Sequence, residues 1–235
     1  MKTIFGAIAI SAALLAAPSQ AREREFYIAV EGGLSLSDEA DVDFEQTNQG
    51  GVQPQAASAQ IEAGLDVDAV IGYDFGVLRV ELEAGYKRAG SDDVTIFTSR
   101  LVDNTNGVTG VNTFTNPENV TAKSAMVNAL VDFGDDDDFQ VYAGFGLGVA
   151  NVDIPITYPG VAPIIEEDTT DLALQAIAGF RLPVSDRVDI GLKYRFFAVD
   201  EFEYVSTFGD TLEVDYETHS LMASVMFNLG RASRQ

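Results

Sequence analysis

Two stretches of the chain alternate apolar and polar residues without interruption. Residues 78–87 read Leu-Arg-Val-Glu-Leu-Glu-Ala-Gly-Tyr-Lys, and residues 188–195 read Val-Asp-Ile-Gly-Leu-Lys-Tyr-Arg. Successive side chains of a β-strand point to opposite faces, so each stretch predicts a strand with one apolar and one charged face. Such a strand suits a soluble sheet, or a membrane barrel whose apolar face contacts lipid while its inner side packs polar groups.

The same alternation recurs and predicts eight strands, over residues 26–36, 60–74, 78–88, 120–133, 139–150, 171–182, 188–198 and 216–229. Long connections of 23, 31, 20 and 17 residues alternate with short ones of three to five residues. An even strand number, with short turns at one end and long loops at the other, is typical of an outer-membrane barrel. We therefore predict an all-β fold, an eight-stranded antiparallel up-and-down transmembrane β-barrel.

The first 21 residues have the features of a secretory signal peptide. Lys2 precedes an apolar run over residues 4–17, and Ser19-Gln20-Ala21 provides a small-x-small cleavage site. The run is too short to span a membrane as a helix. We expect cleavage after Ala21, which leaves residues 22–235 as one barrel domain with four long extracellular loops and a short C-terminal tail. Export of such a barrel predicts a location in the outer membrane of a Gram-negative bacterium.

The alternation also predicts which side chains face lipid. One continuous apolar band is expected to hold Leu78, Val80, Leu82, Val141, Phe145, Leu147, Ile190, Leu192, Val225 and Phe227. Aromatic rings favour the two membrane interfaces. We expect one belt on the outer side, made of Tyr86, Tyr194 and Phe196. A second belt is expected near the short turns, made of Phe75, Phe133, Phe139, Phe180 and Phe227.

Many charged residues are expected to point into the barrel. The inward bases are Arg79, Lys87, Lys123, Arg181, Lys193 and Arg195, and the inward acids include Glu31, Asp66, Asp68, Glu81, Glu83, Asp132 and Asp189. A buried charge without a partner is very unfavourable, so these groups must pair or meet water.

Strands 78–88 and 188–198 lie opposite one another in an eight-stranded barrel. We therefore predict a lumen charge network that joins Glu81 and Glu83 to Lys193 and Arg195. Arg79, Arg181 and Asp189 should lie nearer the periplasmic mouth. The alternative is a set of separate ion pairs between adjacent strands.

Composition limits the partners that this chain can have. The sequence holds 37 acidic and 14 basic residues, for a formal net charge of −23, which argues against binding to nucleic acid. Nineteen acids and a single base, Arg100, fall in the four long loops. These acids could bind divalent cations among anionic lipopolysaccharide head groups, or could simply keep the loops soluble. There is no cysteine, which excludes a disulfide or a lipoprotein anchor on cysteine.

Two features could carry chemistry, and neither predicts a catalytic or metal site. His219 is the one histidine; it shares the outward face of its strand with Glu217, whereas Ser220 points inward. A serine and a histidine on opposite faces do not form a nucleophile–base pair. The four aspartates at 135–138 could hold calcium, but consecutive side chains in a short turn diverge. We expect no enzyme activity, no metal and no cofactor.

Three segments resemble strands of the small eight-stranded outer-membrane barrels of the OmpA-transmembrane and opacity-protein (Opa-like) group. They are Val-Tyr-Ala-Gly-Phe-Gly-Leu-Gly-Val at 141–149, Asp-Ile-Gly-Leu-Lys-Tyr-Arg-Phe-Phe at 189–197, and Val-Asn-Ala-Leu-Val-Asp-Phe at 127–133. The resemblance implies a structural barrel, an adhesin or a surface antigen. One departure is that Phe227 and Leu229 are followed by a six-residue tail, whereas the group usually ends on an aromatic residue.

The expected function is therefore a structural or surface-exposed role, in surface interaction or envelope integrity. Two alternatives remain open: a narrow gated ion or water channel through the charged lumen, and a lipid A-modifying enzyme. The interior of an eight-stranded barrel is just filled by side chains, so we expect no wide pore. The expected partners are outer-membrane lipids, lipopolysaccharide and the barrel insertion machinery, and we expect a monomer.

Overall fold

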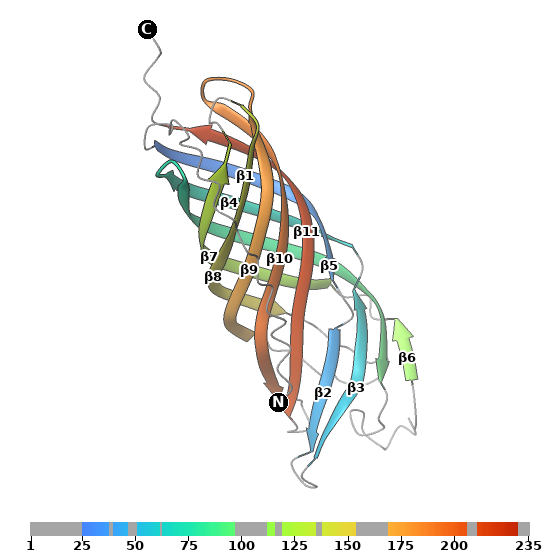
Figure 1. The fold of residues 1–235 in the computed structure, drawn as a ribbon. Helices are drawn as coiled ribbons and strands as arrows, with labels where there is room; N and C mark the ends of the chain where they lie inside the picture. The colour runs from blue at the N-terminus through green and yellow to red at the C-terminus, as the bar shows by residue number, and fades with distance from the viewer. Residues whose placement is uncertain are drawn as a thin grey trace.

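The protein is a closed antiparallel β-barrel (Figure 1). A computed structural model describes residues 25–37, 40–46, 51–61, 63–96, 112–115, 119–134, 138–153, 169–205 and 211–229. Within these ranges it describes the side chains of residues 25–36, 63–90, 119–134, 138–153, 169–199 and 216–229. No helix in these parts is both long and apolar enough to cross a membrane. The predicted signal peptide and the C-terminal tail lie outside the described residues.

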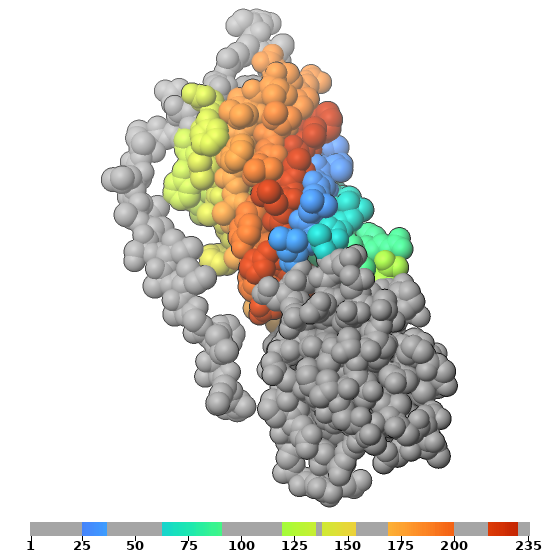
Figure 2. Space-filling model, turned by 90° about the vertical axis from the view of Figure 1, so that its right-hand side faces the viewer, coloured from blue at the N-terminus to red at the C-terminus, as the bar shows by residue number. Residues whose placement is uncertain are grey.

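Eight strands form the barrel wall. They are β1 (Glu25–Ser37), β4 (Gly64–Asp74), β5 (Leu78–Ile96), β7 (Asn119–Phe133), β8 (Gln140–Asp153), β9 (Thr169–Pro183), β10 (Val188–Val205) and β11 (Thr211–Asn228). Each strand pairs antiparallel with the next one in this order, and the pairing of β11 with β1 closes the barrel. Figure 2 shows β10, β11, β1 and β4 side by side on one outer surface. The predicted fold is confirmed.

The strand pairing fixes the tilt of the barrel. Arg88 of β5 is paired with Leu65, and the register continues through Leu34, Leu221, Tyr194, Ala178, Ala143 and Val131 back to Leu78 of β5. One circuit therefore returns ten residues lower on the same strand, a shear number of ten for eight strands. A staggered register of this kind requires strands that tilt by roughly 35–45° from the barrel axis.

The wall extends further than the sequence pattern predicts on the side of the long loops. Residues 37–59, expected as a loop, contain β2 (Ala40–Gln46) and most of β3 (Gly51–Ile61), and β6 (Asn112–Thr115) falls in the second expected loop. The hairpin of β2 and β3 pairs with β11 on one side and β5 on the other, beyond the ends of β1 and β4. Continued pairing satisfies backbone groups that a bare strand end would leave open.

Inward and outward faces alternate along the wall as predicted. Nine of the ten residues expected in the apolar band are exposed, from Val80 at 36% to Phe145 at 67%, and Leu192 is half-buried. The predicted inward position of Lys123 is wrong, because this residue is exposed on the outer face of the barrel. It shares the parity of Ala125 and Val127, and the alternation of β7 holds through this position.

The short turns use glycine where the backbone needs it. Gly76 has φ 104° and Gly134 has φ 117°, a region that residues with a side chain rarely adopt. Asp74 accepts a hydrogen bond from the Gly76 amide at 2.7 Å, and the Phe75 amide donates to the Leu78 carbonyl at 2.8 Å. The β4–β5 connection is therefore a fixed tight turn.

Aromatic rings gather on the outer face at two separate levels. Near the short turns, Phe26 packs edge-on against Tyr73 at 4.7 Å between ring centroids, and Tyr73 against Phe75 at 4.5 Å. All five aromatics predicted for this belt are at least partly exposed there, and Phe26 and Tyr73 extend it. Tyr86, Tyr194 and Phe196 lie farther from the short turns, near the middle of the long strands β5 and β10. Two belts of this kind are typical of a barrel that spans a membrane.

The apolar band predicts the effect of a charge at mid-membrane. Leu82 is 61% exposed and lies midway between the two belts, so Leu82→Arg should destabilise the barrel by about 2–4 kcal/mol. Val184, 56% exposed in the β9–β10 turn, provides a matched control. Val184→Arg should cost about 0–1 kcal/mol, because this position lies near the interface. Urea unfolding in lipid vesicles measures both, and equal losses would contradict the assigned lipid face.

Candidate functional site: the lumen charge network

The interior of the barrel holds two clusters of buried charged side chains. The outer cluster, toward the long connections, consists of Glu31, Asp66, Asp68, Glu83, Lys87, Lys193 and Arg195. The turn-side cluster, toward the short turns, consists of Asp74, Arg79, Glu81, Asp132 and Arg181. Alternation along six neighbouring or opposing strands places all twelve side chains on the lumen face. No member is more than 8% exposed, so these seven acids and five bases face one another and not bulk water.

Arg195 is the centre of the outer cluster. Its Nη1 lies 2.8 Å from Asp68 Oδ2 and 2.7 Å from Glu83 Oε1, and its Nη2 contacts Asp66 Oδ2. Asp66 also accepts from Lys87 Nζ at 2.6 Å and from Ser220 Oγ at 2.5 Å. Arg195 is on β10 and Glu83 is on β5, four strands away around the barrel. This contact therefore crosses the full width of the lumen.

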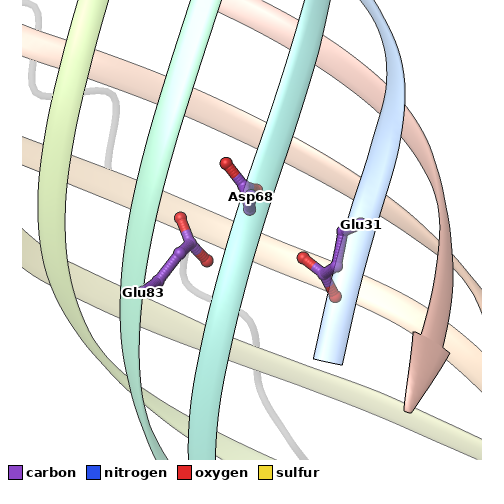
Figure 3. A group of neighbouring side chains, drawn as sticks. All are labelled: Glu31, Asp68 and Glu83. Atoms are coloured by element: carbon purple, nitrogen blue, oxygen red, sulfur yellow. The ribbon is translucent and has the colours of Figure 1, made fainter. Parts of the chain in front are cut away.

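Lys193 is held by three carboxylates from three adjacent strands. Figure 3 shows Glu31 on β1, Asp68 on β4 and Glu83 on β5 with their carboxylates turned toward one another inside the barrel. One oxygen from each lies within 4.8 Å of the others, a spacing that could hold a metal ion. Lys193 Nζ contacts Glu31 and lies 3.2 Å from Asp68 Oδ2 and 3.4 Å from Glu83 Oε2. The lysine ammonium thus occupies the position that a cation would take.

The turn-side cluster is built around two arginines. Arg79 Nε lies 2.7 Å from Asp132 Oδ2, and its Nη1 lies 3.6 Å from Glu81 Oε1. Arg181 Nη2 lies 3.1 Å from Asp74 Oδ2 and 3.6 Å from Asp132. Because Asp74 also holds the β4–β5 turn, this cluster ties the short-turn end of the wall to the lumen.

Two amides connect the clusters. Asn128 Nδ2 donates to Glu83 at 3.0 Å and to Glu81 at 3.3 Å, and Gln175 Nε2 donates to Glu83 at 3.2 Å and to Asn128 Oδ1 at 2.6 Å. Both amides depend on Gly146 of β8, where a Cβ would overlap Asn128 and Gln175. The glycine makes room for the hydrogen bonds that join one cluster to the other.

Aromatic rings cover the clusters at both ends. Phe197, fully buried, lies 4.7 Å from Lys87 Nζ and packs edge-on against Tyr216 at 6.4 Å at the outer end. At the turn-side end, Arg79 lies 4.7 Å from the centroid of the Tyr142 ring. Cations over ring faces are stabilised by the ring quadrupole, most strongly where water is excluded.

The packing leaves little free space. The cavity between the two clusters, lined by Glu31, Arg79, Glu81, Tyr142 and Lys193 among others, has a volume of about 10 Å³. That volume is at the lower limit of what one water molecule needs. The lumen in the described part of the chain is a packed core of charged, neutral polar and apolar side chains.

Residues 6–227 match the model of the outer membrane protein beta-barrel domain family. The chain belongs to this family. Its location is the outer membrane of a Gram-negative bacterium, which agrees with the closed barrel and its lipid-facing band.

The relatives of this outer-membrane barrel are distant. The chain is 23% identical to an uncharacterized protein of Rickettsia conorii, over 97% of this chain and 99% of the relative. It is likewise 23% identical to a protein of Rickettsia rickettsii that is named as a candidate adhesin, over 97% of this chain and all of the relative. The solved structure of the outer membrane protein OprG from Pseudomonas aeruginosa is similar, with a TM-score of 0.57 and 13% sequence identity. The match covers 89% of this chain and 99% of OprG. This structural likeness shows the shared fold.

The structure places the predicted lumen residues with one difference. Glu83 contacts both Lys193 and Arg195, whereas Glu81 contacts Arg79, accepts from Tyr27 at 2.5 Å and reaches the outer cluster only through Asn128. Asp189 is buried near the short-turn end and accepts from Asn228 at 3.1 Å.

The sequence pattern predicts that Asp66 and Asp68 point inward, but not that they lie at the centre of the network. Asn128, Gln175 and Phe197 also take part in it and were not predicted, although strand parity alone places all three inward.

The outward side chains of β11 lie as predicted. His219 is on the outer face, and its Nδ1 lies 2.7 Å from Tyr194 Oη, while the Phe196 ring packs beside it at 5.2 Å. Ser220 is buried on the other face, where it bonds Asp66. Of the four aspartates at 135–138, only Asp138 falls within the described residues.

The three carboxylate contacts of Arg195 predict a large loss on its removal. Arg195→Met leaves Asp66, Asp68 and Glu83 with one base fewer in a dry lumen, and should destabilise the barrel by about 3–5 kcal/mol. Arg187 is exposed in the β9–β10 turn, and Arg187→Met should change stability by no more than about 0.5 kcal/mol. The measurement is urea unfolding followed by the heat-dependent gel shift of the folded barrel. Similar losses for the two variants would contradict a stabilising role of the network.

Proposed function

We propose that this protein is a surface-exposed interaction barrel, in which a sealed transmembrane domain carries an acidic outer surface that takes part in adhesion. The observation that carries the proposal is the packed lumen, because a barrel without a water path acts through what it displays and not through what it transports. The adhesin names of the Rickettsia relatives support the same role.

The lumen network argues against transport as the main function. Arg195 and Lys193 join β10 to β1, β4 and β5, so that a passage for ions would have to break several buried ion pairs together. Removing one partner of a buried pair typically costs about 3–5 kcal/mol. An opening of this kind would be rare in the resting protein.

The outer end of the barrel supports a role in surface interaction. The wall continues past β1 and β4 as the β2–β3 hairpin, and β10 and β11 pair beyond the barrel as far as Val205 and Thr211. The four connecting regions on this side contain 19 acids and one base in the sequence. The β2–β3 hairpin and the long β10–β11 pair would raise these acidic regions above the lipid surface, where a partner with basic groups or bridging divalent cations could bind them.

The proposed function does not include catalysis. The one histidine, His219, shares its Nδ1 with Tyr194, and the adjacent serine faces the opposite side of the wall. A nucleophile and its base must lie within hydrogen-bonding reach, about 2.6–3.2 Å. Within the described side chains, no serine meets this condition at His219.

A sealed lumen predicts that the purified barrel does not conduct. In planar lipid bilayers, the wild-type protein should give no stable ion conductance, because the buried pairs block the path. Arg195→Met and Lys193→Met should give rare, noisy openings if they fold, since they remove bases that cross the lumen. Stable conductance of the wild-type protein would favour the narrow channel instead.

The acidic outer surface predicts a loss of adhesion when its charge is removed. The protein, expressed on the surface of a non-adherent bacterium, should promote attachment to cultured host cells. Neutralising Asp38, Glu39, Asp41 and Asp43 to their amides should lower attachment several-fold, by roughly the loss of a few charge-assisted contacts. The matched control neutralises the four aspartates at 135–138, which belong to the short connection between β7 and β8 in the sequence, and should leave attachment unchanged.

Attachment equal to that of cells without the protein would contradict the adhesion role. Equal attachment by the two neutralised variants and the wild type would instead show that the four acids at positions 38, 39, 41 and 43 do not make the contact.

A further inference from the structure

Two basic side chains on the barrel wall take no part in the lumen network. Among the described side chains, the exposed bases are Arg88 on β5, Lys123 on β7 and Arg187 in the β9–β10 turn. Arg187 is at the short-turn end, whereas Arg88 and Lys123 lie on adjacent strands toward the long connections. Within the described part of the chain, neither Arg88 nor Lys123 forms an ion pair or a hydrogen bond through its side chain. A chain with a net charge of −23 thus presents two unpaired bases together on its lipid-facing side.

The register brings these two bases to nearly the same height in the membrane. Lys123 is paired with Tyr86, two residues before Arg88 on β5. The ten-residue shear spread over eight strands raises each paired row by about 1.25 residues from β5 to β7. Lys123 therefore lies within about one residue of the height of Arg88. The two are diagonal neighbours on one face, about 7–8 Å apart, a distance that two long side chains can close.

The surroundings place the pair at the outer boundary of the hydrocarbon layer. On the side of the short turns, the next outward residues are Tyr86, which is 40% exposed, and the exposed Ala125 of the apolar band. On the same row as Lys123, Asn151 donates to Thr170 Oγ1 at 3.0 Å, so the outer face is polar on the side of β8 and β9. On the other side, Leu65 of β4 is paired with Arg88 and is an exposed apolar residue, so the pair lies where the apolar band ends. The nearest outward acid by register is Asp153, which is paired with Thr121 one row further out.

We propose that Arg88 and Lys123 bind a phosphate group of lipid A, the phosphorylated glycolipid anchor of lipopolysaccharide in the outer leaflet. A guanidinium can bond two phosphate oxygens at once, and an ammonium adds a point charge beside it. In lipid A the phosphates are carried on sugars directly above the acyl chains, the level at which the basic pair lies. The acyl chains then lie along the apolar band below Tyr86. Since the acidic outer surface repels the anionic leaflet, this pair provides the local attraction that seats the lipid.

The test measures lipid A binding to the full-length mature protein folded in mixed micelles. Bisphosphorylated lipid A is titrated, and native mass spectrometry counts the lipid molecules retained per barrel. The double variant Arg88→Gln/Lys123→Gln should bind lipid A at least about tenfold more weakly than the wild type, as expected for loss of charge-assisted contacts. Arg187→Gln, which removes an exposed base at the other end, should bind like the wild type. Heat-dependent gel migration verifies that each variant is folded.

Two further arms separate the phosphate of lipid A from other sources of affinity. Dephosphorylated lipid A should bind the wild type no better than bisphosphorylated lipid A binds the double variant. Phosphatidylglycerol, which offers a phosphate without the sugars, should compete weakly. The proposal is overturned if the double variant retains wild-type affinity, if dephosphorylated lipid A binds equally well, or if phosphatidylglycerol replaces lipid A at equal concentration. If the double variant does not fold, the single variant Lys123→Gln is compared with the wild type. The single variant Arg88→Lys, which keeps the charge, is then the control.

Discussion

The requirement that every buried charge has a partner governs this barrel. An eight-stranded barrel has an interior just wide enough for side chains, and here thirteen of the buried side chains that the structure describes are charged. Burial of an isolated carboxylate or guanidinium would be prohibitive, so acids and bases must meet across the lumen. Arg195 and Lys193 on β10 satisfy this condition for carboxylates on β1, β4 and β5. The same contacts connect opposite sides of the wall and remove the path that a channel would need.

The shear of the barrel decides which groups meet. Because the register climbs ten residues in one circuit, residues of one hydrogen-bonded row are not at equal height on distant strands. Glu83 reaches Arg195, whereas Glu81 falls into the turn-side cluster with Arg79 and Tyr27. Gly146 has no side chain that would overlap Asn128 or Gln175, so the amides of these two residues can link the two clusters. One geometric parameter therefore sets both the strand tilt and the division of the charges into two clusters.

The outer face follows a different rule from the lumen. Lipid requires an apolar band, aromatic belts mark its two edges, and the polar row that contains Lys123, Asn151 and Thr170 begins directly above. The extended β2–β3 hairpin and the long β10–β11 pair then raise the wall above this level. A sealed, rigid base with an extended outer end suits a protein of the outer-membrane barrel family that acts through its surface.

The sequence by itself determined the strand number, the lipid face and most of the lumen face. These follow from alternation, which is a local property: Leu82 must face out if Glu81 and Glu83 face in. The same rule places Lys123 outward, with Ala125 and Val127, and the predicted inward position is wrong. The tertiary structure alone decided which strands continue past the membrane, as β2 and β3 do, because that depends on pairing between residues far apart in the chain. It also decided the partners of each charge. Parity says that Asp66, Asp68, Glu83 and Arg195 share the lumen, but only the shear and the closure of β11 on β1 bring these four into contact.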